Sequence, residues 1–220
     1  IRDEKKLSKI NINPQKKEKP IMVYNLLYAD STFRTLENED DKKIIIANVK
    51  VKIYSDSMQG VCDSLIYNQN DSSFKLYKNP IVWSKNQQSN ADTIFVYTEN
   101  NKLKKLQLIN NAFLLSLTGF ETYYDQVSGI YIDAYFENNE IQQVHVNQNA
   151  ESIYFAKDDN EAYLGSNKSE SATMTVYFKD KEVQKISCID NPKQVFTPID
   201  KETDATKFLN TFRLLTDQKP

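Results

Sequence analysis

Short apolar runs separated by polar clusters characterise the chain from residue 21 to about residue 198. The runs are rich in Ile, Val, Tyr and Phe, and most of them alternate apolar with polar residues instead of following a helical period. A period of two is typical of β-strands, because successive side chains of a strand point to opposite faces. We therefore predict an all-β domain over residues 21–200, preceded by a polar tail, 1–20, and followed by a C-terminal extension, 201–220.

The second half of this region contains three matched pairs of alternating runs. A polar turn joins the two runs of each pair, and its Asn or Asp residues tolerate the positive φ that tight hairpins require. We therefore expect three antiparallel hairpins, and looser copies of the same unit begin at Ala29 and Cys62. The paired runs are 92–97 with 103–108, 130–135 with 141–146, and 172–178 with 183–188.

A dipeptide that begins with Asn recurs along the β region at intervals of about 31 to 42 residues. In each copy the Asn precedes a small, apolar or proline residue at the end of a predicted strand. Recurrence of one hairpin unit predicts stacked units that share a continuous interior. We expect an antiparallel β-jellyroll of about five hairpin repeats, with the dipeptides at Asn48-Val49, Asn79-Pro80, Asn111-Ala112, Asn149-Ala150 and Asn191-Pro192.

Alternation also gives the predicted strands an apolar face. A slip of one residue would bury Lys105 and Gln143, which costs several kcal/mol for each uncompensated group. Such a wall is either the filled core of a β-sandwich or one side of a groove for an apolar ligand, and the scarcity of large aromatic residues slightly favours the groove. The candidate groove residues are Leu65, Tyr67, Phe74, Leu76, Ile94, Val96, Leu106, Leu108, Ile132, Ala134, Val144, Val146, Met174, Val176 and Ile186, with Cys188 on the same face.

The opposite face mixes polar and aromatic side chains. An aromatic surface of this kind is typical of sugar and protein recognition. An extracellular β-repeat module that binds a glycan or a protein through this face is therefore the alternative function. The face carries Lys105, Gln107, Gln143, His145, Lys185 and Ser187, together with Phe95, Tyr97, Tyr131 and Tyr135.

Composition and charge exclude several classes of function. The formal net charge is −2 and the arginines are Arg2, Arg34 and Arg213, which argues against nucleic-acid binding. One His and 4 Gly argue against a His-based zinc site and a phosphate-binding loop. No stretch approaches the roughly 18 apolar residues of a membrane span. The polar N-terminus does not resemble a signal peptide, so we expect that any targeting signal has been removed. We expect a non-enzymatic protein without metal or cofactor.

Residues with reactive or distinctive side chains each have an ordinary structural interpretation. His145 lies on the polar face without a nucleophile motif, so we expect no catalytic role. The alternation places Cys62 and Cys188 on opposite faces of their strands, which favours two isolated thiols, while an oxidising compartment keeps a disulfide open as the alternative. Trp83 is more typical of a packing anchor than of a sugar platform.

Two acidic clusters and the C-terminal apolar residues complete the candidates. The clusters at 37–41 and 158–161 lack the glycine and terminal glutamate of a calcium-binding loop, so we expect solvated loops and not cation sites. Near the C-terminus, Phe208, Leu209, Phe212 and the pair 214–215 follow a spacing that suits either one short helix or a last strand.

The order and spacing of several short motifs resemble the OstA/LptA-like family. The likeness covers roughly residues 23 to 198 and is closest to the OstA-like branch, which is related to the N-terminal domain of the outer-membrane lipopolysaccharide assembly protein. The Gly-Asp pair that usually opens each repeat stands here as Cys62-Asp63, Ala91-Asp92 and Gly129-Ile130. The motifs that carry the resemblance lie at 47–54, 62–67, 74–83, 91–94, 149–155 and 165–168.

The resemblance implies a taco-like β-jellyroll, a periplasmic or outer-membrane-associated location, and transport of lipopolysaccharide. Members of the family hold acyl chains between two sheets and stack end to end through edge strands. We therefore expect lipopolysaccharide or a related lipid as the partner, with end-to-end self-association or stacking on other transport components. The exposed lysines either rim the groove and meet head-group phosphates or are scattered and solvated; they are Lys50, Lys52, Lys104, Lys105 and Lys185.

Overall fold

The structure is a computed structural model, and it describes residues 26–28, 31–37, 43–54, 58–68, 70–99, 102–120, 122–179 and 182–220. The expected N-terminal tail, 1–20, lies outside the described residues. Short helices η1 (Ile199–Lys201), α1 (Asp204–Lys207) and η2 (Thr216–Gln218) follow the last strand. The strands are β1 (Leu26–Tyr28), β2 (Ser31–Glu37), β3 (Lys43–Tyr54), β4 (Gln59–Asn68), β5 (Ser73–Tyr77), β6 (Ile81–Ser84), β7 (Gln87–Asn90), β8 (Thr93–Glu99), β9 (Lys102–Leu117), β10 (Tyr124–Glu137), β11 (Glu140–Lys157), β12 (Tyr163–Lys179), β13 (Glu182–Ile189) and β14 (Lys193–Pro198).

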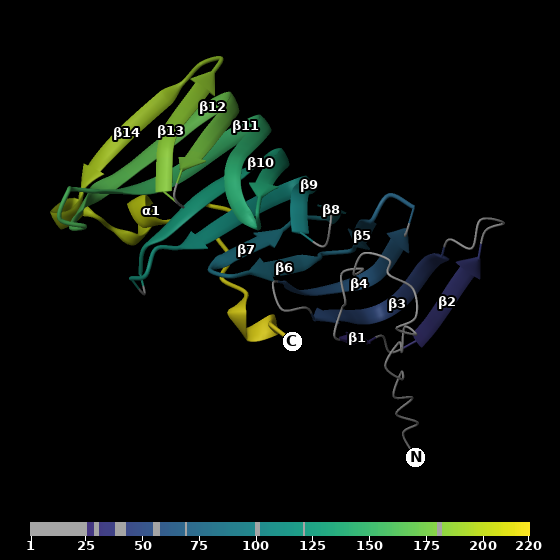
Figure 1. The fold of residues 1–220 in the computed structure, drawn as a ribbon. Helices are drawn as coiled ribbons and strands as arrows, with labels where there is room; N and C mark the ends of the chain where they lie inside the picture. The colour runs from purple at the N-terminus through teal and green to yellow at the C-terminus, as the bar shows by residue number, and fades with distance from the viewer. Residues whose placement is uncertain are drawn as a thin grey trace.

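One antiparallel sheet contains all of these strands and folds over on itself into two layers (Figure 1). Strands β3, β4, β9, β10, β11 and β12 run through both layers, which confirms the predicted antiparallel β-jellyroll class. Layer A comprises 31–37, 43–48, 64–68, 73–77, 93–99, 102–109, 131–137, 140–147, 173–179 and 182–189. Layer B comprises 26–28, 51–54, 59–62, 81–84, 87–90, 112–117, 124–128, 150–157, 163–171 and 193–198.

Strands β3, β9 and β11 cross between the layers at pairs of residues with positive φ, and similar pairs follow β5 and β13. In β9 the pair is Asn110 and Asn111, with φ of 58° and 50°. Asn adopts this left-handed conformation more readily than most residues because its short polar side chain bonds locally. The recurrent Asn dipeptides of the sequence therefore mark corners of the fold. The prediction that each one ends a strand is wrong for β3, β9 and β11, which continue past theirs. The other corner pairs are Val49/Lys50, Lys78/Asn79, Gln148/Asn149 and Asp190/Asn191.

The three predicted hairpins form, with the expected register. Ile94 lies opposite Leu108, Ile132 opposite Val146, and Met174 opposite Cys188. The turn between β10 and β11 has positive φ at Asn138 and Asn139 (51° and 62°), as the sequence predicts. The turn residues 100–101 and 180–181 of the other two hairpins lie outside the described residues. Local turn chemistry and strand alternation thus suffice to define these pairs.

The residues after 203 pack on the outer face of layer B, and we name residues 204–215 the C-terminal strap. The apolar stretch 208–215 forms neither the helix nor the strand that its spacing suggested, because α1 ends at Lys207 and irregular chain follows. In Figure 1 this yellow segment passes from the β12 side towards β6 and β7. Its apolar side chains join a second core on layer B, which contains Phe113, Leu115, Tyr124, Ile153, Phe155 and Leu209, with Phe208 and Phe212 partly buried against it.

Candidate functional site

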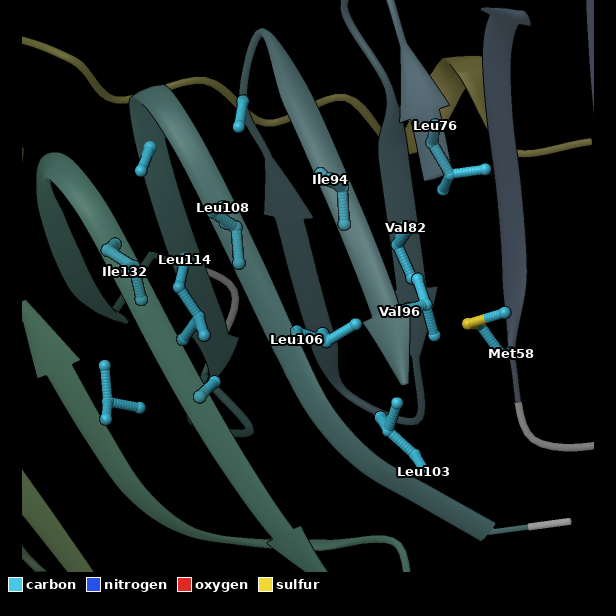
Figure 2. Packing of buried hydrophobic residues seen from close by; sticks show 14 of the residues in the cluster. Met58, Leu76, Val82, Ile94, Val96, Leu103, Leu106, Leu108, Leu114 and Ile132 are labelled. Carbon is cyan, nitrogen blue, oxygen red and sulfur yellow. The ribbon is translucent and has the colours of Figure 1, made fainter. Parts of the chain in front are cut away.

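The space between the two layers contains the candidate groove residues. The structure places them on the inner face of layer A in one apolar cluster, and all except the half-buried Tyr67 and Ile186 are buried. Figure 2 shows Ile94, Leu106 and Leu108 pointing into the same interior as Val82 and Leu114 of layer B. Whether a lipid occupies this interior stays a prediction.

A small cavity of about 20 Å³ lies between the two layers, lined on the layer A side by Val176, Phe178, Val183 and Ile186. That volume holds roughly one water molecule. Around this cavity the two layers pack as a core, and an acyl chain can enter there only if the layers move apart.

The interior is incompletely covered at the edge formed by β13 and β14. These strands both pair with β12, one in each layer, and they diverge from a shared corner (Figure 1). On β13, Val183, Ile186 and Cys188 are only partly buried against the core. On β14, Phe196 lies opposite Asn167 and is 53% exposed. Apolar side chains of the interior are therefore accessible from this edge.

The inner wall of layer B carries polar groups that the sequence analysis missed. The Asp125 carboxylate accepts a hydrogen bond from the Phe155 backbone N–H at 3.0 Å, and burial raises the pKa of Asp125 to about 7. Ser152 and Ser169 lie opposite each other on β11 and β12, 2% and 0% exposed. Among the described residues, neither hydroxyl has a hydrogen-bond partner. The inward direction of Ser152 could have been predicted from the sequence, because Ala150 and Ser152 lie on the same face of their strand.

Both cysteines are free, as the sequence favoured, but their predicted placement on opposite faces is wrong. Cys62 is buried in the interior cluster and Cys188 packs against the same cluster. β4 passes from layer B to layer A between Cys62 and Leu65, where a register shift against β3 changes which parity faces inward. Burial raises the pKa of Cys62 to about 12, so its thiol is protonated and unreactive near neutral pH.

Two of the candidate rim lysines lie on the outer face of layer A and do not rim the interior. Lys105 pairs with Asp133 at 2.9 Å and lies over the Tyr135 ring. Lys185 lies over the Tyr177 ring, 5.8 Å from its centroid. Their position on the outer face argues against the first of the two alternatives that the sequence left open, a lysine rim around the groove.

The remaining candidate lysines occupy two other places. Lys104 pairs with Glu99 at 3.3 Å. Lys50 and Lys52 line a surface hollow of about 330 Å³ together with the Asp63–Lys78 ion pair. This hollow lies at the corners within β3 and β4 and after β5, and Val51 and Cys62 of the interior cluster also line it.

The other single-residue candidates occupy structural positions. His145 Nδ1 lies 3.0 Å from Thr175 Oγ1 on the outer face. Trp83 is buried, which suits a packing anchor. Asp158 accepts the backbone N–H groups of Asn160 and Ala162, which lower its pKa and define a loop. The described residues include no cluster of three or more His, Cys, Asp or Glu residues suited to a metal ion, and the acidic cluster 37–41 lies largely outside them. Across the described ranges, no helix has the length and hydropathy of a membrane span.

Comparison with known proteins decides the fold but not the activity. No family model matches the sequence, and no curated protein matches it. A solved structure does: the crystal structure of LptH from Pseudomonas aeruginosa, the LptA homologous periplasmic component of the conserved lipopolysaccharide transport device. The similarity covers 64% of this chain and 95% of that chain, with a TM-score of 0.50 and 12% sequence identity. This chain has an LptA-like fold. At that identity the likeness to LptH establishes the fold alone.

Proposed function

We propose that this protein is a non-enzymatic periplasmic component of lipopolysaccharide transport or outer-membrane assembly that holds acyl chains between layers A and B. The observation that carries the proposal is the continuous aliphatic inner face of layer A, which runs from β4 to β13 in a fold shared with LptH. Each buried methylene contributes about 0.8 kcal/mol, so a few acyl chains bind such a wall strongly. No directional contact has to break when a chain moves along it.

Entry of a chain requires the layers to separate, and we place this separation at the β13–β14 edge. Because each of these strands pairs with β12 in a different layer, the two can move apart while both backbone ladders stay intact. Separation removes the dispersion attraction between the layers at Phe178, Val183 and Ile186, and an acyl chain in the same space restores it. The closely packed interior of this structure is then the state of the protein without a bound acyl chain.

Site-specific photocrosslinking tests the proposal. A photoreactive residue replaces Leu106 or Val144 in the interior, or Tyr97 or Tyr135 on the outer face as matched controls on the same layer. We expect lipopolysaccharide adducts at the two interior positions and few at the tyrosines. Adducts confined to the tyrosine positions would contradict the proposal.

Edge strands also support end-to-end assembly as part of the proposed function. β13 and β14 each have β12 as their neighbour and present a second edge to solvent. Sedimentation velocity is expected to show linear growth of the oligomer with protein concentration. A sedimentation coefficient that stays that of the monomer at high concentration would remove stacking from the proposal while leaving lipid binding in place.

A second candidate function is glycan binding by the outer face of layer A, and one specific observation favours it. Tyr97, Tyr135 and Tyr177 lie in one transverse row on every second strand, with Lys105 and Gln143 between them in register. Tyr135 and Tyr177 are each 40% exposed. Crosslinking of saccharides, and not of lipid, at Tyr97 and Tyr135 is the result expected from this alternative.

A further inference from the structure

The outer face of layer A carries tyrosines at a regular interval. Tyr97 of β8, Tyr135 of β10 and Tyr177 of β12 lie in one row across the sheet, with one strand between each pair. Tyr135 and Tyr177 are each 40% exposed, and Tyr97 is half-buried. Neighbouring strands are about 4.8 Å apart, so the rings recur about every 9.6 Å. The row therefore presents aromatic surfaces to solvent with a defined period.

Packing between the rings does not explain this period. Aromatic side chains on a sheet commonly stabilise it by contact with directly opposite neighbours, and the centroids of paired rings lie about 4.5–7 Å apart. The tyrosines of the row are two strands apart, which exceeds that distance. Each ring therefore offers its exposed surface singly, as a platform for a group from outside the chain.

A polar side chain lies between each pair of rings. Lys105 of β9 is in register with both Tyr97 and Tyr135. Gln143 of β11 is in register with both Tyr135 and Tyr177. The Lys105 ammonium lies 5.2 Å from the centroid of the Tyr135 ring, so a hydrogen-bond donor and a stacking surface are adjacent. The row thus alternates aromatic surfaces with side chains that donate hydrogen bonds.

An extended β-1,4-linked glycan has the matching period. Successive sugar rings of such a chain are turned by half a revolution, so every second ring presents the same face to one side. The repeating disaccharide is close in length to two strand spacings, about 9.6 Å. The C–H face of a sugar packs on an aromatic ring, while its hydroxyls take hydrogen bonds from polar side chains. The first, third and fifth sugars then stack on the tyrosines, and the second and fourth lie beside Lys105 and Gln143.

The twist of the sheet restricts the form of the glycan. Neighbouring strands rotate by about 20–25° relative to each other, so the line through the tyrosines is twisted. A single glycan chain follows such a line by small rotations at each glycosidic bond, whereas the flat surface of a crystalline glycan does not. The row therefore suits a single soluble chain.

We propose that the outer face of layer A binds a single extended β-1,4-linked glycan across its strands, with alternate sugar rings stacked on Tyr97, Tyr135 and Tyr177. The inference rests on the second candidate function, glycan binding, and adds the linkage and the orientation of the glycan. The site lies on the opposite face of layer A from the interior proposed for acyl chains, so one molecule can hold both ligands.

Isothermal titration calorimetry of the full chain compares cellohexaose with maltohexaose, which contain the same sugar in β-1,4 and α-1,4 linkage. We expect cellohexaose to bind at least about fivefold more tightly, because the curled α-1,4-linked chain loses two of the three stacking contacts. Among shorter β-1,4-linked oligosaccharides, the affinity is expected to increase at three and again at five sugar units, the lengths that reach the second and the third tyrosine.

Variants of the central tyrosine test the row itself. Tyr135→Ala is expected to lower the affinity for cellohexaose by about twofold to tenfold, and Tyr135→Phe, which keeps the ring, is expected to retain it. Tyr131→Ala is the matched control, because Tyr131 lies on the same strand and face, is 41% exposed and stands outside the row. An affinity in Tyr135→Ala no lower than in Tyr131→Ala would overturn the inference.

The remaining outcomes separate this inference from the function on which it rests. Equal affinity for cellohexaose and maltohexaose overturns the proposed linkage and leaves glycan binding by this face in place. Failure of both to bind overturns the inference, and saccharide crosslinking at Tyr97 and Tyr135 then decides whether the second candidate function fails with it. Lipid binding is tested independently, by the interior crosslinks at Leu106 and Val144.

Discussion

Asp125 shows how the environment of a single residue changes its chemistry. Its carboxyl group lies on the inner wall of layer B, where burial raises its pKa to about 7. The hydrogen bond from Phe155 N–H and the charge of Lys157 act in the opposite direction but are outweighed. Tyr154, next along β11 from Ile153, has a raised pKa through burial and through the charge of Asp125. The carboxyl group is thus poised to titrate near neutral pH.

Stability is expected to decrease as pH rises from about 4 to about 7 on account of Asp125. The unfolded carboxyl has a pKa near 3.9, so between these values the folded state binds more protons, and the free energy of unfolding decreases with pH. Asp125→Asn is expected to remove this slope and to raise the free energy of unfolding at pH 8 by up to about 4 kcal/mol. Urea unfolding at several pH values measures the effect. Asp159→Asn, in an exposed loop, is the control, and an unchanged slope in Asp125→Asn would contradict the assignment.

Asn111 tests the importance of a corner residue. Its φ is 50°, and its amide donates to both carboxyl oxygens of Asp92 at 3.0 and 3.1 Å. Asn111→Val is expected to lower the free energy of unfolding by about 1–2 kcal/mol or more, since a β-branched residue is strained there. Asn111→Gly loses the same hydrogen bonds but accepts the φ, so chemical denaturation should give it the smaller loss. Equal losses would assign the effect to the bonds with Asp92.

At the scale of elements, β14 depends on a glycine in its neighbour. A Cβ added to Gly165 of β12 would meet the Thr197 carbonyl oxygen and the Phe196 ring. Gly165→Ala is therefore expected to push β14 away from β12 and to increase hydrogen exchange in residues 193–198. The matched control is Gly119→Ala, where a Cβ meets nothing within 4 Å. Unchanged protection of β14 in Gly165→Ala would show that the edge can shift without losing its ladder.

At the scale of the whole molecule, two buried glutamines attach the C-terminal strap to layer B. Gln126 donates to the Lys207 carbonyl at 2.7 Å and accepts the Leu209 N–H at 2.9 Å. Gln88 bonds in the same way to the Arg213 carbonyl and the Leu215 N–H. At each attachment the glutamine amide supplies the hydrogen bonds that a neighbouring strand would otherwise give to the strap backbone. The strap therefore needs no regular secondary structure of its own.

Gln126→Ala is expected to lower the free energy of unfolding by about 2–4 kcal/mol, because it leaves two strap backbone groups unpaired in a buried site. Gln142→Ala, an exposed glutamine on β11, is the control and is expected to change stability by less than about 0.5 kcal/mol. Chemical denaturation compares the two. A loss in Gln126→Ala no larger than in the control would mean that aromatic packing alone holds the strap.

Strand alternation and turn chemistry by themselves determined the hairpins and the inward face of layer A. Both depend on local properties: side chains alternate along any strand, and Asn138 and Asn139 accept the turn wherever they occur. For the same reason the inward direction of Ile94, Leu108 and Ile132 follows from their own strands, whichever strands pair with them.

Only the tertiary structure decided the features that depend on the two layers together. At the corner of β4 between Cys62 and Leu65, the side chains that face inward change from even-numbered to odd-numbered positions. This change places Cys62 in the core. The strap takes its conformation from Gln88, 125 residues away from its partner Arg213, which no local spacing encodes. The hydroxyls of Ser152 and Ser169 have no hydrogen-bond partner among the described residues, and this follows from which side chains the fold packs against them. Local periodicity fixes the direction of a side chain within its own strand, whereas the free volume and the partners it meets depend on where a distant part of the chain is packed.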